Sequence, residues 1–358
     1  MAVIAEARPV VARDRVRDRR AVRAWLHIVA LMIVAIVVIG GATRLTGSGL
    51  SITEWRPVHG VIPPLSDRDW QEEFARYRQI PQYVILNQGM TLPEFQSIFW
   101  WEWAHRLLGR LIGAVALAPL VLFWATGRLE PQLKPKLVAI VLLVGVQGAV
   151  GWWMVASGLS ERTDVSQYRL AIHLTLACAI LAYVLWVARS IAPASRPSSA
   201  SLRLVAGLIV ALAFVQIFLG GLVAGLDAGL TFNTWPLMDG TLVPSGLLIR
   251  EPWWINPFEN VATVQFDHRL GGYVLFAVAL LHAVQARRTN HAGGGFVLAG
   301  LVALQAALGI ATLVYSVPLP LALAHQLGAV AVLSLAVTHL RSMSSPLPVR
   351  VATETAAG

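Results

Sequence analysis

The sequence predicts an all-α polytopic membrane protein, with eight transmembrane helices arranged as two parallel-repeat four-helix bundles. Three observations lead to this prediction. Hydrophobic residues make up 56% of the 358 residues and charged residues only 13%, whereas a soluble domain carries about 25% charged residues. The apolar residues are gathered into blocks of about 20, the length that crosses the hydrocarbon core of a bilayer. An internal repeat divides these blocks into two sets of four.

We expect one transmembrane helix for each apolar block. The first block is too long, and too poorly followed by a cleavage site, for a signal peptide, so it is interpreted as a helix. The expected spans cover residues 24–43, 104–125, 136–156, 170–190, 203–224, 267–286, 296–315 and 320–340.

Two of the connecting loops, 44–103 and 225–266, are much longer than the others. Loops of this length usually carry function or secondary structure of their own. Within the first loop, Asp67–Gln79 is polar and compatible with a helix that has its aromatic residues on one side. We therefore expect an interfacial helix there, packed over the mouth of the bundle. The aromatic residues are Trp70, Phe74 and Tyr77.

The formal net charge of +9 reflects topology rather than nucleic-acid binding. Arginine and lysine gather before the first span and after every second span, whereas acidic residues gather in the opposite loops. This is the positive-inside bias, which places both termini in the cytoplasm. The arginine-rich N-terminal tail is expected to meet anionic membrane lipid, and no nucleic-acid partner is expected. The tail arginines are Arg8, Arg13, Arg15, Arg17, Arg19, Arg20 and Arg23.

Residues recur between the two halves of the chain at constant offsets, with an offset of 180 around the first and fifth spans. The second and sixth spans share the motif His-Arg-Leu-x-Gly. Since each half has four spans, both halves have the same orientation in the membrane. The matched pairs include Gly40 and Gly220, Gly41 and Gly221, Trp55 and Trp235, His105 and His268, Gln147 and Gln305, Gly151 and Gly309, and His173 and His325.

The repeat divides the chain into five parts. The linker between the halves is rich in proline, serine and alanine. The parts are an arginine-rich cytoplasmic tail (1–23), an N-terminal four-helix half (24–190), a cytoplasmic linker (191–202), a C-terminal four-helix half (203–342) and a cytoplasmic tail (343–358).

Four of the nine histidines lie in register across the repeat, namely His105, His173, His268 and His325. Each lies near the start of an even-numbered span, so all four imidazoles are expected at a similar depth on the external side. Ionisable groups inside a membrane are costly and tend to mark function. Two histidines per half, on separate helices, suit axial ligation of the iron of a haem that lies between them.

Two other interpretations of the histidines are a zinc site and a second haem position. A zinc site would need three or four converging ligands, and no HExxH or CxxC spacing supplies them. His282 and His339 each follow a proposed ligand by 14 residues, a rise of about 21 Å along a helix. That spacing would suit stacked haems in an electron-transfer cytochrome. However, both residues fall at cytoplasmic span ends, where an exposed histidine is unremarkable.

The remaining histidines, His27, His59 and His291, are interpreted as interface or loop residues. The single cysteine, Cys178, lies inside the fourth span and is interpreted as a small apolar core residue. One cysteine excludes an intramolecular disulfide and a thiolate metal cluster.

The two halves differ beside the matched histidines of the second and sixth spans. Glu102 precedes His105 by three residues on the same helix face, and its counterpart is Gln265. A carboxylate can take up a proton and an amide cannot, so the first site suits proton transfer, although the helix dipole also favours a glutamate here. The arginines that follow the two histidines can pair with haem propionates or simply reach the interface. Arg106 then belongs to the site of the N-terminal half and Arg269 to that of the C-terminal half.

Several motifs, in order along the chain, resemble those of haem A synthases of the branch shared by mitochondria and proteobacteria. The resemblance covers about 25–341. Some bacterial members carry a cysteine pair in the first external loop, which this chain lacks, so a thiol role there is excluded. The motifs are GGATRLTGSGLS at 40–51, Glu54-Trp55, Glu102-Trp103-x-His105-Arg106, Phe266-Asp267-His268-Arg269-Leu270 and His325-Gln326-Leu327-Gly328.

The resemblance implies an enzyme that oxidises the C8 methyl of haem O to the formyl of haem A through two successive hydroxylations. It implies a resident haem b on His268 and His325, and haem O as the substrate on His105 and His173. Glu102 is then the catalytic residue that assists the oxidised methyl.

The resemblance also implies a place and partners. The protein is expected in the bacterial inner membrane, with both haem sites toward the periplasm. Expected partners are the haem O synthase or oxidase-assembly proteins, membrane lipid and an electron donor that the sequence does not identify, and a homo-oligomer stays open. Two other functions also stay open, namely a dihaem b-type electron-transfer cytochrome and a haem transporter or chaperone.

Overall fold

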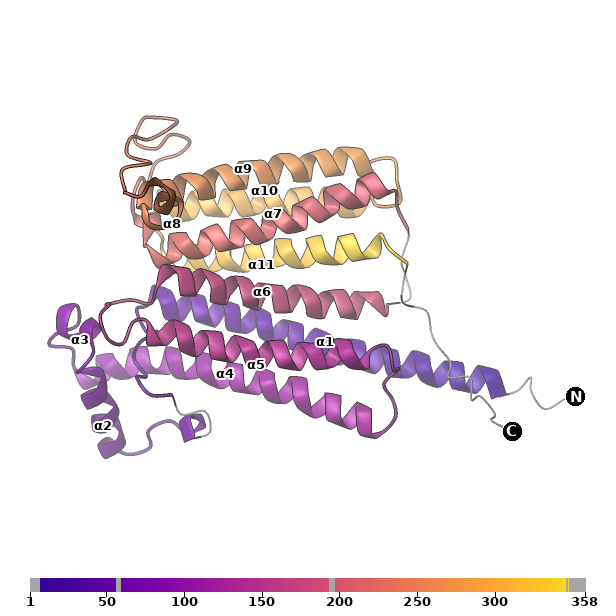
Figure 1. The fold of residues 1–358 in the computed structure, drawn as a ribbon, viewed down its shortest axis with the longest axis horizontal. Coiled ribbons are helices and arrows are strands. Elements are labelled where there is room, and N and C mark those ends of the chain that lie inside the picture. The colour runs from indigo at the N-terminus through magenta and orange to yellow at the C-terminus, as the bar shows by residue number, and fades with distance from the viewer. Residues whose placement is uncertain (1–6, 56–58, 193–196, 346, 348–358) are drawn as a thin grey trace, which may run out of the picture.

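The computed structural model describes residues 7–55, 59–192, 197–345 and 347 (Figure 1). Within this described part the chain is helical and contains no β-strand. The outer parts of both predicted tails and the middle of the predicted linker lie outside it. The long helices are α1 (Ala7–Leu45), α4 (Leu92–Ala125), α5 (Lys134–Ala156), α6 (Gln167–Ser190), α7 (Ala200–Gly225), α9 (Val261–Ala286), α10 (Ala292–Val314) and α11 (Leu319–Ser342).

These eight long helices confirm the predicted class. Each is long and apolar enough to cross a membrane, and they lie side by side along one axis (Figure 1). Every predicted span falls inside one of them, apart from the last residue of 296–315, because α10 ends at Val314. The apolar blocks therefore located the helices well, although they gave shorter elements than the structure has.

The long helices form two groups that meet along a seam. Figure 1 shows α1, α4, α5 and α6 in one group and α7, α9, α10 and α11 in the other. At the seam, α6 packs against α7 and α11, and α1 packs against α11. The core of the first group includes Cys178, which is 1% exposed, as predicted. The division into two repeats of the same orientation stays a prediction.

Glycines bring the two groups into close contact at the seam. A Cβ on Gly221 of α7 would lie 2.7 Å from the Cα of Ala171 in α6. A Cβ on Gly41 of α1 would overlap the side-chain oxygen of Gln326 in α11. The Gln326 amide donates a hydrogen bond to the Val37 carbonyl at 3.0 Å. Because real Cβ atoms do not approach so closely, a larger residue at Gly221 would push the two groups apart, whereas one at Gly41 would displace the Gln326 amide.

Both long loops lie at the same end of the helices, which we term the loop end (described residues 46–55, 59–91 and 226–260). Figure 1 shows it at the left, opposite the beginning of α1. The short helices of the loop end are η1 (His59–Val61), α2 (Asp67–Tyr77), α3 (Pro81–Ile85), η2 (Ala228–Leu230), η3 (Trp253–Ile255) and α8 (Asn256–Glu259).

Helix α2 confirms the helix that the sequence predicts at Asp67–Gln79, and its place at the membrane interface stays a prediction. Ser66 begins it with a capping box, in which the Asp69 backbone N–H donates to the serine hydroxyl and the Asp69 carboxylate accepts from the Ser66 N–H. Its aromatic face packs on α4, where the Trp70 ring lies 4.9 Å from the ring of Phe99. These contacts hold α2 across the loop end of the first group.

Helix α4 begins well before its predicted start at residue 104. Thr91 forms a capping box with Glu94, whose carboxylate accepts the Thr91 backbone N–H at 2.7 Å. Pro93 stands in the first turn, where its missing N–H costs nothing. The added turns lie outside the apolar block and bury Phe95 against α2. An estimate from hydropathy alone therefore cannot include them.

The predicted N-terminal tail is part of α1, which runs without a break from Ala7. Arg19 binds Glu130, in the loop between α4 and α5, through two hydrogen bonds of 2.5 and 2.8 Å. Glu130 is only 2% exposed. Burial alone would raise the pKa of this carboxyl, but the Arg19 hydrogen bond brings it below its usual value. This arginine therefore meets a carboxylate of the same chain, in place of the lipid expected for the tail.

We expect Arg19→Ala to destabilise the protein, because it leaves the Glu130 carboxylate buried without its partner. Breaking one side of a buried ion pair typically costs about 3–5 kcal/mol. Thermal unfolding in detergent measures the loss. Arg20, which is exposed, provides the matched control: Arg20→Ala should unfold like the wild type, and equal behaviour of the two variants would contradict the prediction.

The sidedness of the membrane insertion follows from charge and is tested by reporter fusions. We expect fusions after Pro131, Pro197 and Thr289, and at both termini, to report a cytoplasmic location. Fusions within 67–79 should report the external side. A C-terminal fusion that reports the external side would contradict both the eight-span topology and the repeat.

Candidate functional site

The four repeat-matched histidines lie on four different helices, all of which begin at the loop end. His173 is the seventh residue of α6 and His325 the seventh of α11, whereas His268 is the eighth of α9. These three therefore lie about 10 Å along their helices. His105 lies farther from the start of its helix, because α4 begins farther out at the loop end than the other three helices. All four side chains are half-buried.

His268 and His325 face each other in the second group. Their ring centroids lie 6.3 Å apart and their planes cross at 84°. Two imidazoles on opposite sides of one metal ion, with bonds of about 2.0 Å and about 1.1 Å from nitrogen to ring centre, have centroids about 6.2 Å apart. The separation of this pair therefore fits two axial ligands of one iron.

In the first group, His105 lies on α4 and His173 on α6. They share a further feature with the second pair, since the ring of each of the four histidines packs against a glycine of the adjacent helix. A Cβ on these glycines would lie within 3.3 Å of the ring Cε1. The pairs and distances are Gly40 and His105 at 2.8 Å, Gly151 and His173 at 2.9 Å, Gly220 and His268 at 3.3 Å, and Gly309 and His325 at 2.7 Å.

These glycines are themselves repeat-matched, and the sequence located them without revealing their role. Any larger side chain would displace the ring. Each histidine is thus fitted to its neighbouring helix in the same way, which supports a common function for all four sites.

Glutamine amides hold three of the four histidines. The Gln147 amide nitrogen lies 3.0 Å from the His173 carbonyl oxygen and 3.1 Å from its Nδ1. The amide of Gln305 makes the same contacts to His325, at 2.8 and 3.0 Å. The repeat aligns these two glutamines, so a signal for them was present in the sequence. The sequence contains no such match for the third.

The third amide belongs to Gln216 of α7, which sequence reasoning missed. Its nitrogen lies 2.8 Å from the His268 carbonyl oxygen and 3.1 Å from the His268 Nδ1. The offset of 180 places Ile36 at the matching position of α1. His105 correspondingly has no hydrogen-bond partner at Nδ1 among the described residues. A lone amide in the apolar run of α7 was the available signal.

Glu102 fastens the loop that follows α1 to α4. Its carboxylate accepts hydrogen bonds from the Ser51 hydroxyl at 2.8 Å and from the Ile52 backbone N–H at 2.7 Å. It also accepts from the Arg106 guanidinium at 2.7 and 3.0 Å. Glu102 is 3% exposed. The carboxylate is therefore buried and fully hydrogen-bonded, one turn from His105.

Arg106 and Arg269 make matching contacts in the two halves. Arg106 donates to the carbonyls of Ile52 at 2.6 Å and Glu54 at 3.0 Å. Arg269 donates to the carbonyls of Phe232 at 2.7 Å and Thr234 at 3.0 Å, which are the same loop positions displaced by 180. Both guanidinium groups thus anchor a loop, and their pairing with propionates stays a prediction.

Gln265 occupies the place of Glu102 in the second half. Its amide nitrogen donates to the Ala228 carbonyl at 2.7 Å and to the Thr231 carbonyl. Its oxygen accepts from Arg269 at 3.0 Å. The amide therefore performs the same loop attachment without a charge, and only the first half retains an ionisable group here.

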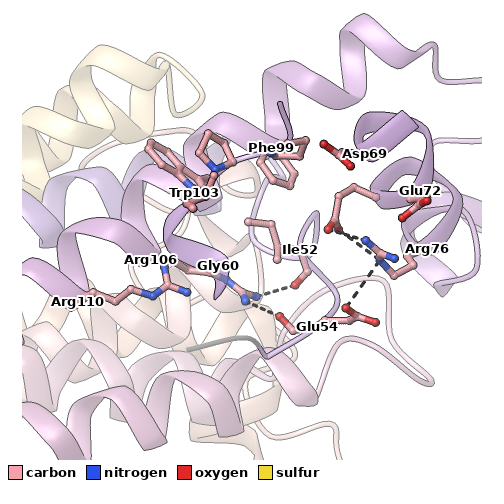
Figure 2. Close-up of a pocket in the computed structure, with 14 residues that line it drawn as sticks. Ile52, Glu54, Gly60, Asp69, Glu72, Arg76, Phe99, Trp103, Arg106 and Arg110 are labelled. Atoms are coloured by element: carbon pink, nitrogen blue, oxygen red, sulfur yellow. Dashed lines mark hydrogen bonds and ion pairs between the residues drawn. The ribbon is translucent and has the colours of Figure 1, made fainter. Parts of the chain in front are cut away.

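A cavity of about 190 Å³ lies at the loop end of the first group, between α2, α4 and the loop after α1 (Figure 2). Figure 2 shows Arg106 and Arg110 on one side of it, and Arg76 with its acidic neighbours on the other. Arg76 pairs with Glu73 at 2.6 Å. The cavity is smaller than the roughly 300–1,000 Å³ of drug-sized ligand sites, so it is a polar recess beside the histidine site.

His282 and His339 are buried, which corrects the expectation that they are exposed. They are 0% and 6% exposed, and their Nε2 atoms lie 2.9 Å apart. One imidazole donates to the other through these two nitrogens. His291, interpreted above as an interface or loop residue, begins α10 with its ring 6.0 Å from that of His339. The centroids of His282 and His339 lie 5.2 Å apart, too close for an iron between them.

Comparisons with known proteins agree with the motifs. A family model described as cytochrome oxidase assembly protein matches residues 23–337. A haem A synthase of Mesorhizobium japonicum is 57% identical over 354 residues, which are 97% of this chain and 98% of that protein. Haem A synthases of Brucella anthropi and Brucella ovis are each 58% identical over 331 residues, covering 91% of this chain and 93% and 92% of theirs. The chain therefore belongs to the cytochrome oxidase assembly protein family.

Proposed function

We propose that this protein is a haem A synthase, a membrane oxidoreductase that oxidises the C8 methyl of haem O to the formyl group of haem A. The proposal rests on the two two-histidine sites, in a chain that is 57% identical to a haem A synthase over 97% of its length. The product serves terminal oxidases, in keeping with the family's description as cytochrome oxidase assembly proteins.

The two sites have different tasks. His268 and His325 hold a resident haem b, and the 6.3 Å separation of their rings supports this assignment. When bound, that haem supplies electron transfer. His105 and His173 receive haem O as substrate, in the half that carries the ionisable Glu102. The N-terminal half (24–190) is thus the substrate half and the C-terminal half (203–342) the cofactor half.

Glu102 and the loop attached to it shape the substrate site. The carboxylate lies one turn from His105 and binds two loop groups, the Ser51 hydroxyl and the Ile52 N–H. Oxidation of a methyl group through hydroxylated intermediates requires protons to move and positive charge to be stabilised near that carbon. Glu102 can perform both tasks, whereas Gln265 at the matching position cannot exchange a proton. Arg106 keeps the carboxylate in place.

The protein acts in the bacterial inner membrane with both termini cytoplasmic and the loop end periplasmic. This placement rests on the distribution of arginine and lysine. Haem O reaches it from the haem O synthase, and haem A leaves toward oxidase-assembly proteins. The electron donor is a separate component.

Extraction and chromatography of haem from cells with and without the protein test the function. We expect haem A only where the protein is present, and haem O to accumulate where it is absent. Haem O that stays unchanged in both would overturn the proposal and favour a haem carrier. Two permanent low-spin haems with an unaltered haem pool would favour an electron-transfer cytochrome.

A further inference from the structure

The four histidines differ in how firmly they are held. Gln216 joins α7 to α9 at His268, and Gln305 joins α10 to α11 at His325. Gln147 joins α5 to α6 at His173. We refer to these three amides as the clamps. Between α1 and α4 no clamp exists, because residue 36 is isoleucine and offers His105 only its backbone carbonyl.

The neighbouring residues are adapted to the clamps in the second group. A Cβ on Gly271 would overlap the amide oxygen of Gln216, and one on Gly328 would overlap that of Gln305. Both glycines stand three residues after a histidine. The residues three after His105 and His173 are Leu108 and Leu176. In the second group, glycines therefore leave space for the amides of two clamps. The first group has one clamp, and leucines occupy the matching positions.

The clamps also have free capacity for hydrogen bonding. The side-chain oxygens of Gln147, Gln216 and Gln305 are buried and have no partner among the described residues. A histidine that binds a metal through one ring nitrogen carries a proton on the other and needs an acceptor for it. The clamps have their amide nitrogen beside Nδ1, and turning the amide would bring its oxygen to the Nδ1 proton. His105 has no such amide and is left with the Ile36 backbone carbonyl, whose direction is set by helix α1.

We propose that the clamps set how long each site keeps its haem, and that His105, as the unclamped ligand, lets the substrate site exchange. A site clamped on both histidines retains its haem. A site clamped on one releases it, as an enzyme that takes up haem O and gives out haem A requires. This inference rests on the proposed function for its biological meaning, but its physical content concerns only haem retention.

The test is the rate at which haem b leaves the purified full-length protein for excess apomyoglobin. We expect Gln216→Ile to lose haem about 10–100-fold faster, the usual effect of removing a partner of a metal ligand. Isoleucine stands at the matching position 36, so the side chain suits this kind of helix contact. The spectrum of the haem still bound should remain that of a bis-imidazole site.

The reverse change adds a clamp to the substrate site. Ile36→Gln combined with Leu108→Gly supplies both the amide and the space that Gln216 has beside Gly271. In a His268→Ala background, where only the first group is loaded with haem b, this double variant should hold haem about 10–100-fold longer. Leu108→Gly alone controls for lost packing.

Gln326→Leu is the control for a glutamine that touches no histidine, since Gln326 binds the Val37 carbonyl across the seam. Its haem loss should equal that of the wild type. Wild-type retention in Gln216→Ile, or no gain from Ile36→Gln over Leu108→Gly alone, would overturn the inference. Neither readout needs turnover, so a protein that failed to make haem A would contradict the proposed function without touching the clamps.

Discussion

Replacing either histidine of the cofactor half with alanine should remove most of the resident haem. In His268→Ala or His325→Ala the iron loses one of its two imidazoles, and alanine offers no donor atom in its place. The 6.3 Å separation of the His268 and His325 rings suits a shared iron. The haem content of the purified protein and its reduced-minus-oxidised spectrum give the measurement.

The second buried pair supplies the matched control for this prediction. His282→Ala and His339→Ala remove imidazoles of the same helices, about 21 Å farther along, where the rings bond directly to each other. Both variants should keep their haem. Full haem content in both His268→Ala and His325→Ala would refute the assignment, and haem loss in His282→Ala would favour the stacked dihaem cytochrome.

Glu102→Gln should fold, keep the resident haem and produce little or no haem A. The expected fall in rate is about 10²–10⁴-fold, the usual worth of a positioned acid or base. Haem O or a hydroxylated form should accumulate in its place. Gln265 shows that an amide can attach the loop and bind the following arginine at the matching position. Chromatography of the extracted haems measures the effect.

Glu102→Gln can lower activity either through the lost charge or through a displaced loop, because Glu102 also holds the loop. Ser51→Ala removes one of the hydrogen bonds to the carboxylate and leaves the charge in place. If the charge matters, Ser51→Ala should retain much more activity than Glu102→Gln. Equal losses in the two variants would reduce Glu102 to a loop anchor, and normal haem A production by Glu102→Gln would exclude the proton-transfer role altogether.

The fold was predictable because a helix needs about 20 apolar residues to cross the hydrocarbon core of a bilayer. Each apolar block marked one helix, and the spacing of aromatic residues marked α2. The predicted helices were too short where capping or ion pairs extend a helix beyond its apolar block. Thr91 and Glu94 extend α4 through local capping, and α1 continues through a polar segment that Arg19 ties to Glu130. Such contacts join distant positions, and hydropathy contains no information about them.

The site was predictable in its residue types and less so in its arrangement. The matched histidines and glycines could be found from the repeat, because both halves pack histidine rings against glycines of the adjacent helices. Gln216 was missed because a search for repeated residues finds similarity, and here the halves differ. His282 was expected to be exposed because its position near a span end was known, whereas its partner His339 lies 57 residues away in the chain.

The glycines of the seam fix a distance as well as a contact. Gly221 lies against Ala171 of α6, two residues before His173, and immediately follows Gly220, against which His268 packs. The seam is thus built from residues adjacent to both histidine sites. With haem bound at both proposed sites, electrons passing between them would have to cross this seam by tunnelling, whose rate falls steeply with separation. A Cβ at Gly221 would then act as a spacer and slow that transfer.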